Sequence, residues 1–359
     1  MILDILWFVV SFGAVLGFLI FAHELGHFIL AKMMGVGVKK FSLGFGPRIV
    51  SKKVGMTEYM ISWIPLGGYV KMVGEEPDAE LDASLIPLSY SHKGVGKRAL
   101  IILAGPLFNV LLAVVIFFSL FQLSGLPIME PEVGELREGM PAETSGMRPG
   151  DRVVSIDGKP VHRWGDMADS ITESGGKRLR FEVLRGNRTI FMGITPQLFP
   201  SQDIWGEEVA KYAIGITASG ASSILPLNVI QSAKESLTHT WQIADLTTVA
   251  IWKIVTGKIS ARALGGPILI AQLTGEEAKA GLVSLMFFVA VLSVNLGVIN
   301  LLPIPILDGG HLLFCLIEGV SRRPVNLRVR EVAQQVGFLV LVLLMLFVFY
   351  NDIARVLFD

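Results

Sequence analysis

Long hydrophobic runs recur at four places along the chain, and three of them, at 99–129, 280–307 and 332–351, contain no charged residue. A helix that crosses a bilayer needs about 20 consecutive, mostly apolar residues. The pattern therefore predicts an α-helical integral membrane protein with four transmembrane helices, at residues 1–34, 98–124, 280–317 and 336–356. The first run could instead be a signal peptide, but Asp4 stands where a basic start is usual and no small-residue cleavage site precedes Lys32. We expect it to remain as a span.

Between these runs, polar and apolar residues alternate over short distances, as they do in β-strands. Residues 35–97 contain short runs punctuated by glycine, which predict a membrane-associated β-hairpin region. Its role is either a structural cover or an exposed strand edge that pairs with an unwound substrate. Residues 125–200 alternate around Pro-Gly, Asp-Gly and Gly-Asn turns and predict a β-rich α+β domain. We expect a linker with an amphipathic segment at 201–279 and a short turn at 318–335.

Basic residues are distributed unevenly around the predicted spans. Ten lysines and arginines lie in residues 32–98 and four arginines in 318–331, whereas the opposite ends of the spans carry almost none. Because basic flanks stay on the cytoplasmic side, we expect the hairpin region in the cytoplasm. Both termini and the inserted domain are then expected to be extracytoplasmic.

The overall composition also indicates a membrane protein. Hydrophobic residues make up 52% of the chain and charged residues 17%, against about 25% charged in an average soluble domain. The 31 basic and 31 acidic residues leave no net charge, so no basic field for nucleic acid exists. The single cysteine, Cys315, excludes a disulfide framework and a four-cysteine zinc site. Any metal must therefore be held by His, Asp or Glu.

The first predicted span carries three ionisable residues, His23, Glu24 and His27, in an HExxH pattern. An ionisable side chain in hydrocarbon costs about 2.5–3.5 kcal/mol on insertion scales, so it needs a partner or a purpose. Positions i and i+4 share one face of a helix, where two neutral imidazoles can bind one zinc ion. Glu24 lies beside the metal rather than on it, as a general base should. The alternative is a hydrogen-bonded polar cluster that tightens the helix bundle.

A catalytic zinc needs a third protein ligand and an open position for water. Asp308 is the only formally charged residue from 280 to 317, and it is the expected ligand. His311 is the alternative ligand, but we expect it to be a histidine that lies beside the site, because Asp308 is harder to explain otherwise. Pro303 and Pro305 should break the helix before Asp308, which membrane proteins tolerate where the backbone lines a cavity.

Two asparagines carry polar amides in the predicted spans, Asn109 in the second and Asn300 in the third. Asn300 precedes Asp308 by eight positions, so its amide could bind substrate or stabilise an oxyanion. It could equally hold two helices together. Asn109 is expected to join helices, although it could face the same cavity.

Three features together resemble the site-2 protease family. They are the HExxH pattern, the pattern Asn-x-x-Pro-x-Pro-x-Leu-Asp-Gly-Gly that starts at Asn300, and an insert that resembles a bacterial PDZ domain at 133–136, 141–143 and 146–158. The resemblance covers nearly the whole chain. It implies a zinc metalloprotease that cuts single-pass membrane proteins in or near their spans. Its ligands would be His23, His27 and Asp308, and its base Glu24.

The same resemblance implies regulated intramembrane proteolysis in the bacterial inner (cytoplasmic) membrane, with anti-sigma factors or remnant signal peptides as candidate substrates. The expected partners are these single-pass substrates, peptide ends bound by the PDZ domain, and the lipid bilayer, with no nucleic acid. Some members of the family carry two PDZ domains in tandem, whereas residues 125–278 have room for one. That difference leaves the exact substrate open.

Two other classes of protein share part of this pattern. Ionisable residues beside broken helices at the bilayer midplane also occur in cation transporters, so a zinc transporter with a peptide-binding regulatory domain is the alternative. Many such transporters are built from internal repeats, and this sequence shows no repeat symmetry that would favour a transporter. A membrane-anchored PDZ adaptor is the other alternative, but it would have no reason to keep a metal triad and a base.

Overall fold

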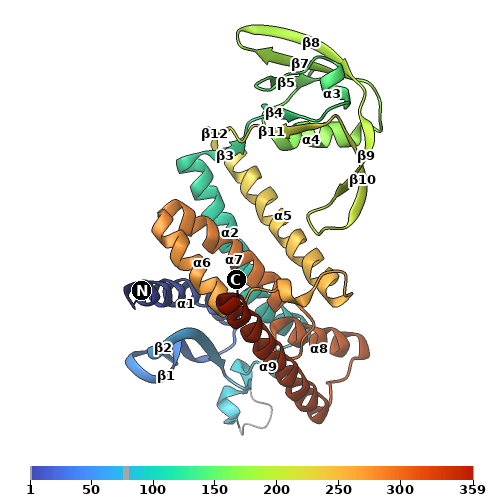
Figure 1. Ribbon diagram of the computed structural model, residues 1–359. Coiled ribbons are helices and arrows are strands. Elements are labelled where there is room, and N and C mark those ends of the chain that lie inside the picture. The colour runs from blue at the N-terminus through green and yellow to red at the C-terminus, as the bar shows by residue number, and fades with distance from the viewer. Residues whose placement is uncertain (1, 76–80, 359) are drawn as a thin grey trace. The chain divides into compact units, whose positions relative to one another are not determined.

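The computed structural model describes residues 2–75 and 81–358, and the chain divides into two compact units. One unit comprises Met1–Leu120 and Ile230–Asp359 and is built mainly from helices. The other comprises Phe121–Val229 and is built mainly from strands (Figure 1). We call them the helical unit and the strand unit.

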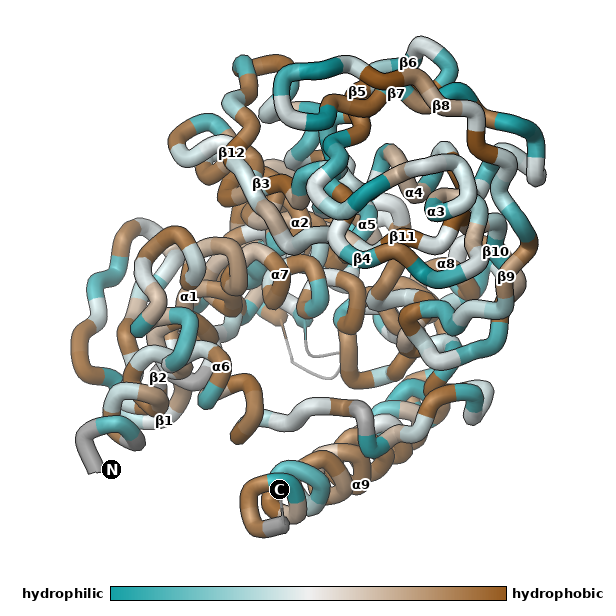
Figure 2. The backbone as a smooth tube through the Cα atoms, turned by 45° about the horizontal axis from the view of Figure 1, so that its top comes forward, coloured by the Kyte–Doolittle hydropathy of each residue, from teal (hydrophilic) through white to brown (hydrophobic). Residues whose placement is uncertain are grey.

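The helical unit contains most of the helices of the chain. They are α1 (Ile2–Met33), α2 (Val95–Ser124), α5 (Val229–Val255), α6 (Pro267–Ala280), α7 (Leu282–Asn300), α8 (Asp308–Ser321) and α9 (Leu327–Phe358), with short 3-10 helices at Ala83–Leu88 and Ala261–Ala263. Four of them, α1, α2, α7 and α9, are long and apolar enough to cross a membrane, which confirms the four predicted spans. Figure 2 shows apolar residues along much of α9. The protein is therefore a membrane protein.

The third span ends earlier than predicted. Helix α7 stops at Asn300 and a separate helix, α8, begins at Asp308, so one helix does not continue to residue 317. Pro303 and Pro305 between them cannot donate backbone hydrogen bonds, and the chain turns there. The start of α8 lies so close to this turn that a Cβ atom at Gly309 would collide with backbone carbonyls of the turn. The turn thus places Asp308 at the first position of a new helix.

Strands β1 (Val38–Val54) and β2 (Thr57–Met72) form an antiparallel hairpin, as predicted for this region. Near its open end, Phe41 and Val70 pack with residues of α1 in a buried apolar cluster. Toward its turn the hairpin keeps large apolar side chains exposed, including Ile49 and Trp63. One end of the hairpin is therefore anchored on the helix that carries the HExxH pattern.

The strand unit contains a sheet in the order β6-β5-β7-β8 and the pairs β4–β11, β3–β12 and β9–β10. Its elements are β3 (Leu126–Met129), β4 (Val133–Leu136), α3 (Pro141–Thr144), β5 (Arg152–Ile156), β6 (Lys159–Pro160), α4 (Trp164–Glu173), β7 (Leu179–Arg185), β8 (Arg188–Ile194), β9 (Gln197–Gln202), β10 (Glu208–Ala213), β11 (Ile216–Ala218) and β12 (Ser222–Leu225). The predicted strand before the Asp-Gly turn and the hairpin around Gly186 are both present. Val153 and Phe181, from neighbouring strands, are fully buried in its core.

The strand unit continues beyond residue 200, where its end was predicted. Strand β11 pairs with β4, and β12 pairs with β3, so residues near 220 complete the unit that starts near 126. The predicted linker at 201–279 therefore contains strands of this unit and, after it, helices α5 and α6. These strands are short, and their partners lie 80 to 99 residues earlier in the chain, so no local pattern predicts the pairing.

Helix α9 is fastened to the helical unit near its end. The buried carboxylate of Asp352 accepts hydrogen bonds from the backbone N–H groups of Gly266, Ile268 and Leu269 at 2.9–3.2 Å. These N–H groups start α6 and have no partner within their own helix. A carboxylate also interacts favourably with the positive end of a helix dipole. Asp352 therefore caps α6 and joins it to α9.

Candidate active site

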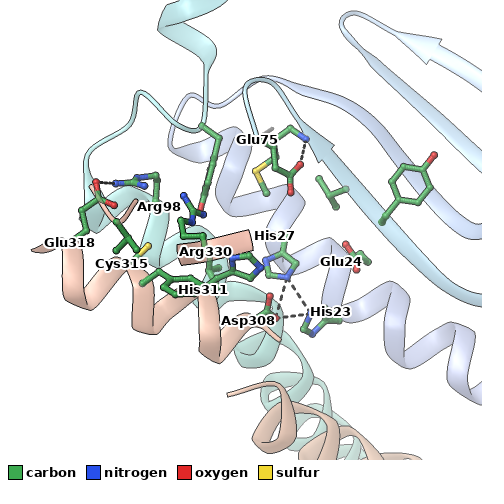
Figure 3. A pocket seen from close by; sticks show the side chains of 17 residues that line it. His23, Glu24, His27, Glu75, Arg98, Asp308, His311, Cys315, Glu318 and Arg330 are labelled. Carbon is green, nitrogen blue, oxygen red and sulfur yellow. Dashed lines mark hydrogen bonds and ion pairs between the residues drawn. The ribbon is translucent and has the colours of Figure 1, made fainter. Parts of the chain in front are cut away.

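Two histidines of α1 and one aspartate of α8 meet at a single point of the helical unit. His23 and His27 lie one helical turn apart, and their Nε2 atoms are 3.2 Å from each other. Asp308 Oδ2 lies 3.0 Å from Nε2 of His23 and 3.5 Å from Nε2 of His27. Figure 3 shows the three side chains pointing toward one another. The turn after α7 and the helical spacing of the two histidines together produce this cluster.

The chemistry and spacing of the cluster fit a zinc ion. Atoms bound tetrahedrally to zinc at about 2.0–2.1 Å lie about 3.3–3.4 Å apart, close to the three separations observed. Asp308 Oδ2 is buried, and its polar neighbours are the Nε2 atoms of the two histidines. A buried carboxylate oxygen that faces two imidazole nitrogens suits a cation bound between them. Among the described residues, His23, His27 and Asp308 form the group of histidine and carboxylate side chains whose ligand atoms lie close enough together to hold one metal ion.

A cavity of about 310 Å³ opens beside the cluster and lies within the helical unit. Its walls come from α1, β2, α2, α8 and α9 and include many ionisable side chains (Figure 3). Arg98 and Glu318 close one side of it with an ion pair of 2.6 Å. A cavity with such walls admits water to a site that lies among apolar helices.

Glu24 lines this cavity but is not one of the three clustered residues. Strand β2 runs beside it, and a Cβ atom at Gly68 would lie 3.4 Å from Glu24 Cγ. Glu24 therefore adjoins both the histidines and the strand. Its role as the general base stays a prediction.

His311, the alternative third ligand, lies one turn after Asp308 on α8 and lines the same cavity. It is not part of the close cluster of potential ligands, and its ring is an edge-on neighbour of Phe314 at 6.4 Å between centroids. The geometry thus favours Asp308 over His311.

The two asparagines singled out in the sequence both reach His23. Asn300 Nδ2 lies 3.5 Å, and Asn109 Nδ2 lies 3.3 Å, from His23 Nδ1, the ring nitrogen that faces away from the cluster. Asn300 is partly exposed, whereas Asn109 is fully buried. A contact between Asn109 and a histidine of the cluster was not predicted. The available signal was a polar amide in an otherwise apolar span.

Comparisons with known proteins agree with this geometry. The sequence profile of peptidase family M50 matches residues 11–344. A Mesorhizobium japonicum protein provisionally named a zinc metalloprotease is 37% identical over 96% of this chain and 98% of its own length. A Campylobacter jejuni protein with the same kind of provisional name is 34% identical over 99% and 97% of the two chains. The zinc metalloprotease RasP of Geobacillus kaustophilus is 31% identical over 97% and 98%.

Membrane-spanning helices that enclose a cluster of two histidines and a carboxylate are the features of a membrane metallopeptidase. The chain belongs to peptidase family M50. It is a zinc metalloprotease, and zinc is its cofactor. This membership does not support the alternative of a zinc transporter.

Proposed function

We propose that this protein hydrolyses peptide bonds in or near the transmembrane segment of single-pass membrane proteins. The observation that carries the proposal is the meeting of His23, His27 and Asp308 among helices of membrane-spanning length. In this proposal these three residues hold the zinc ion, and Glu24 is the general base. The process would be regulated intramembrane proteolysis, with anti-sigma factors or remnant signal peptides as candidate substrates.

The residues around the cluster have separate tasks in peptide hydrolysis. When bound, zinc supplies Lewis-acid polarisation of the scissile carbonyl and activation of water near neutral pH. Glu24 accepts a proton from the attacking water and delivers it to the leaving amine. Asn300, partly exposed beside the cluster, is the candidate to bind substrate or to donate a hydrogen bond to the carbonyl oxygen as it gains negative charge.

A transmembrane substrate must lose part of its helix before it is cut. The carbonyls of a helix are bonded to N–H groups four residues later, which shields them from attack. Strand β2 contributes Tyr69, Val70 and Met72 to the wall of the cavity. We infer that this part of the strand pairs with the unwound segment and presents it to Glu24, because an extended peptide can add to a strand edge.

We also propose that the strand unit is the single PDZ domain predicted from the sequence and that it recognises peptide ends. Support comes from a groove of about 580 Å³ between α4 and β11. Its lining includes the apolar side chains of Trp164, Met167 and Ile171 and the basic side chains of Arg137 and Lys211. An apolar groove beside a strand suits an extended peptide, and the two cations would attract its terminal carboxylate.

The proposed location is the bacterial inner membrane, with both termini and the strand unit extracytoplasmic. The support is the cluster of basic residues in 32–98 and 318–331 and the bacterial sources of the relatives. In a Cys315→Ala background, Asn187→Cys in the β7–β8 turn should react with a membrane-impermeant thiol reagent in cells whose outer membrane is permeabilised. Ser84→Cys in the hairpin region should react only after lysis. Both positions are exposed, so equal labelling of the two would contradict the topology.

The proposed activity is tested by incubating the protein, purified in detergent, with a single-pass membrane protein. We expect cleavage in or near the span, loss of cleavage after chelation, and recovery on addition of one equivalent of zinc. Zinc accumulation in proteoliposomes without any cleavage would instead favour transport.

The same assay tests whether the strand unit controls substrate access. Leu126 and Leu225 are directly paired, and such neighbours lie about 5 Å apart, so a short Gly-Ser linker can replace residues 127–224. If the unit excludes substrates with bulky outer domains, its removal should speed cleavage of a full-length substrate and barely change that of one trimmed to a short stub. Equal loss on both substrates, with zinc retained, would indicate that the unit stabilises the protein.

A further inference from the structure

Helix α2 contacts both histidines of the cluster on the side that faces away from the metal position. The backbone carbonyl oxygen of Ile101 lies 2.8 Å from His27 Nδ1. The side-chain amide of Asn109 lies 3.3 Å from His23 Nδ1. The Nε2 atoms of both rings point instead toward each other and Asp308. One helix thus supplies a polar neighbour for each ring.

The position of the ring proton decides whether each histidine can bind metal. A neutral imidazole carries one proton, and only the bare nitrogen can be a ligand. If Nε2 binds zinc, then Nδ1 carries the proton and needs a hydrogen-bond acceptor. His27 has such an acceptor in the carbonyl of Ile101. His23 needs an equivalent one.

Asn109 can provide this acceptor if its amide oxygen faces His23. The oxygen and nitrogen ends of a carboxamide have nearly the same shape and exchange places on a rotation of 180°. Asn109 Oδ1 has no hydrogen-bond partner among the described residues, so the rotation breaks no bond to that atom. With nitrogen toward Nδ1, the proton of His23 would sit on Nε2 and block the metal. A zinc site therefore requires the orientation in which the amide oxygen of Asn109 faces His23 Nδ1.

The backbone around Asn109 is held firmly in place. Ser293 Oγ of α7 donates a hydrogen bond of 2.7 Å to the Asn109 backbone carbonyl, and both residues are fully buried. One turn earlier on α2, Gly105 leaves room for the rings, since a Cβ atom there would collide with His27 Nε2 and His23 Cε1. Because Asn109 has no exposed surface, it cannot contact a substrate in the cavity.

We propose that Asn109 is a positioning residue whose amide oxygen accepts the Nδ1 proton of His23 and so keeps Nε2 bare and directed at zinc. The inference rests on the proposed function, in which His23 is a zinc ligand. Asn300 also reaches His23 Nδ1, but at 3.5 Å and from a partly exposed position. In this assignment the amide of Asn300 is available to bind the substrate.

The test measures zinc affinity of the full-length protein by competition with a chelator of known affinity. Asn109→Leu, which has a similar volume and no acceptor, should bind zinc about 10–100-fold more weakly, the usual effect of removing a partner of a ligating histidine. Asn109→Asp keeps an acceptor oxygen and should restore affinity close to that of the wild type. The visible spectrum of the cobalt-loaded protein should change in Asn109→Leu and return in Asn109→Asp.

Two matched variants distinguish positioning from a general loosening of the bundle. Asn295→Leu removes the amide that accepts a 2.7 Å hydrogen bond from Thr247 between α7 and α5, and it should keep wild-type zinc affinity. Asn300→Leu should also keep it. The inference is overturned if Asn109→Leu binds zinc like the wild type, if Asn109→Asp is as weak as Asn109→Leu, or if Asn295→Leu weakens binding equally. Zinc affinity that survives His23→Ala would instead contradict the proposed ligand set.

Discussion

Glu24→Gln is expected to retain zinc but to cut substrate about 10²–10⁴-fold more slowly than the wild type, the range that a general base contributes. Glutamine has nearly the same shape as glutamate, so it should preserve the packing against β2 and the histidines. Its amide cannot accept the proton of the attacking water. The measurement is the single-turnover rate of cleavage at saturating substrate, together with zinc content by atomic absorption.

Glu75→Gln is the matched control for this variant, because Glu75 is a second carboxylate that lines the same cavity. Its Oε2 accepts a hydrogen bond of 3.0 Å from the backbone N–H of Met72, which is a local structural contact. We expect only a small change in rate. A Glu24→Gln protein that cleaves nearly as fast as the wild type would remove Glu24 as the base. An equal loss in Glu75→Gln would indicate a general effect of charge in the cavity.

His23→Ala, His27→Ala and Asp308→Ala are each expected to lower zinc affinity by more than about 100-fold. The expected loss of affinity is larger than the loss of about 10–100-fold that follows removal of a residue hydrogen-bonded to a ligand. Each variant would leave two of three protein ligands, and affinity falls steeply with ligand number. Zinc content after gel filtration and chelator competition both report the loss, and cleavage should disappear with the metal.

His311→Ala is the control that separates the two candidates for the third ligand. His311 lies one turn from Asp308 on the same helix and lines the same cavity, but it stands outside the close cluster. We expect this variant to keep zinc near one equivalent per chain. Full zinc in Asp308→Ala together with loss in His311→Ala would show that the histidine is the ligand.

The spans and the HExxH histidines could be predicted because their signals are local. About 20 apolar residues define a membrane helix wherever it packs, and the i, i+4 spacing alone places His23 and His27 on one face. The turn residues around Gly186 likewise predicted a hairpin without reference to the rest of the chain. Pro303 and Pro305 indicated a break in the third span, although the helix ends at Asn300, before either of them.

The sequence by itself determined the four spans, the HExxH residues His23, Glu24 and His27, and the presence of a small β-rich insert. Only the tertiary structure decided that Asp308 rather than His311 joins the cluster and that β11 and β12 complete the strand unit. It alone also brought Asn109 to His23, 86 positions away, and Asn300 to the same ring, 277 positions away. Contacts over such separations depend on how helices and strands pack, and no local periodicity records that packing.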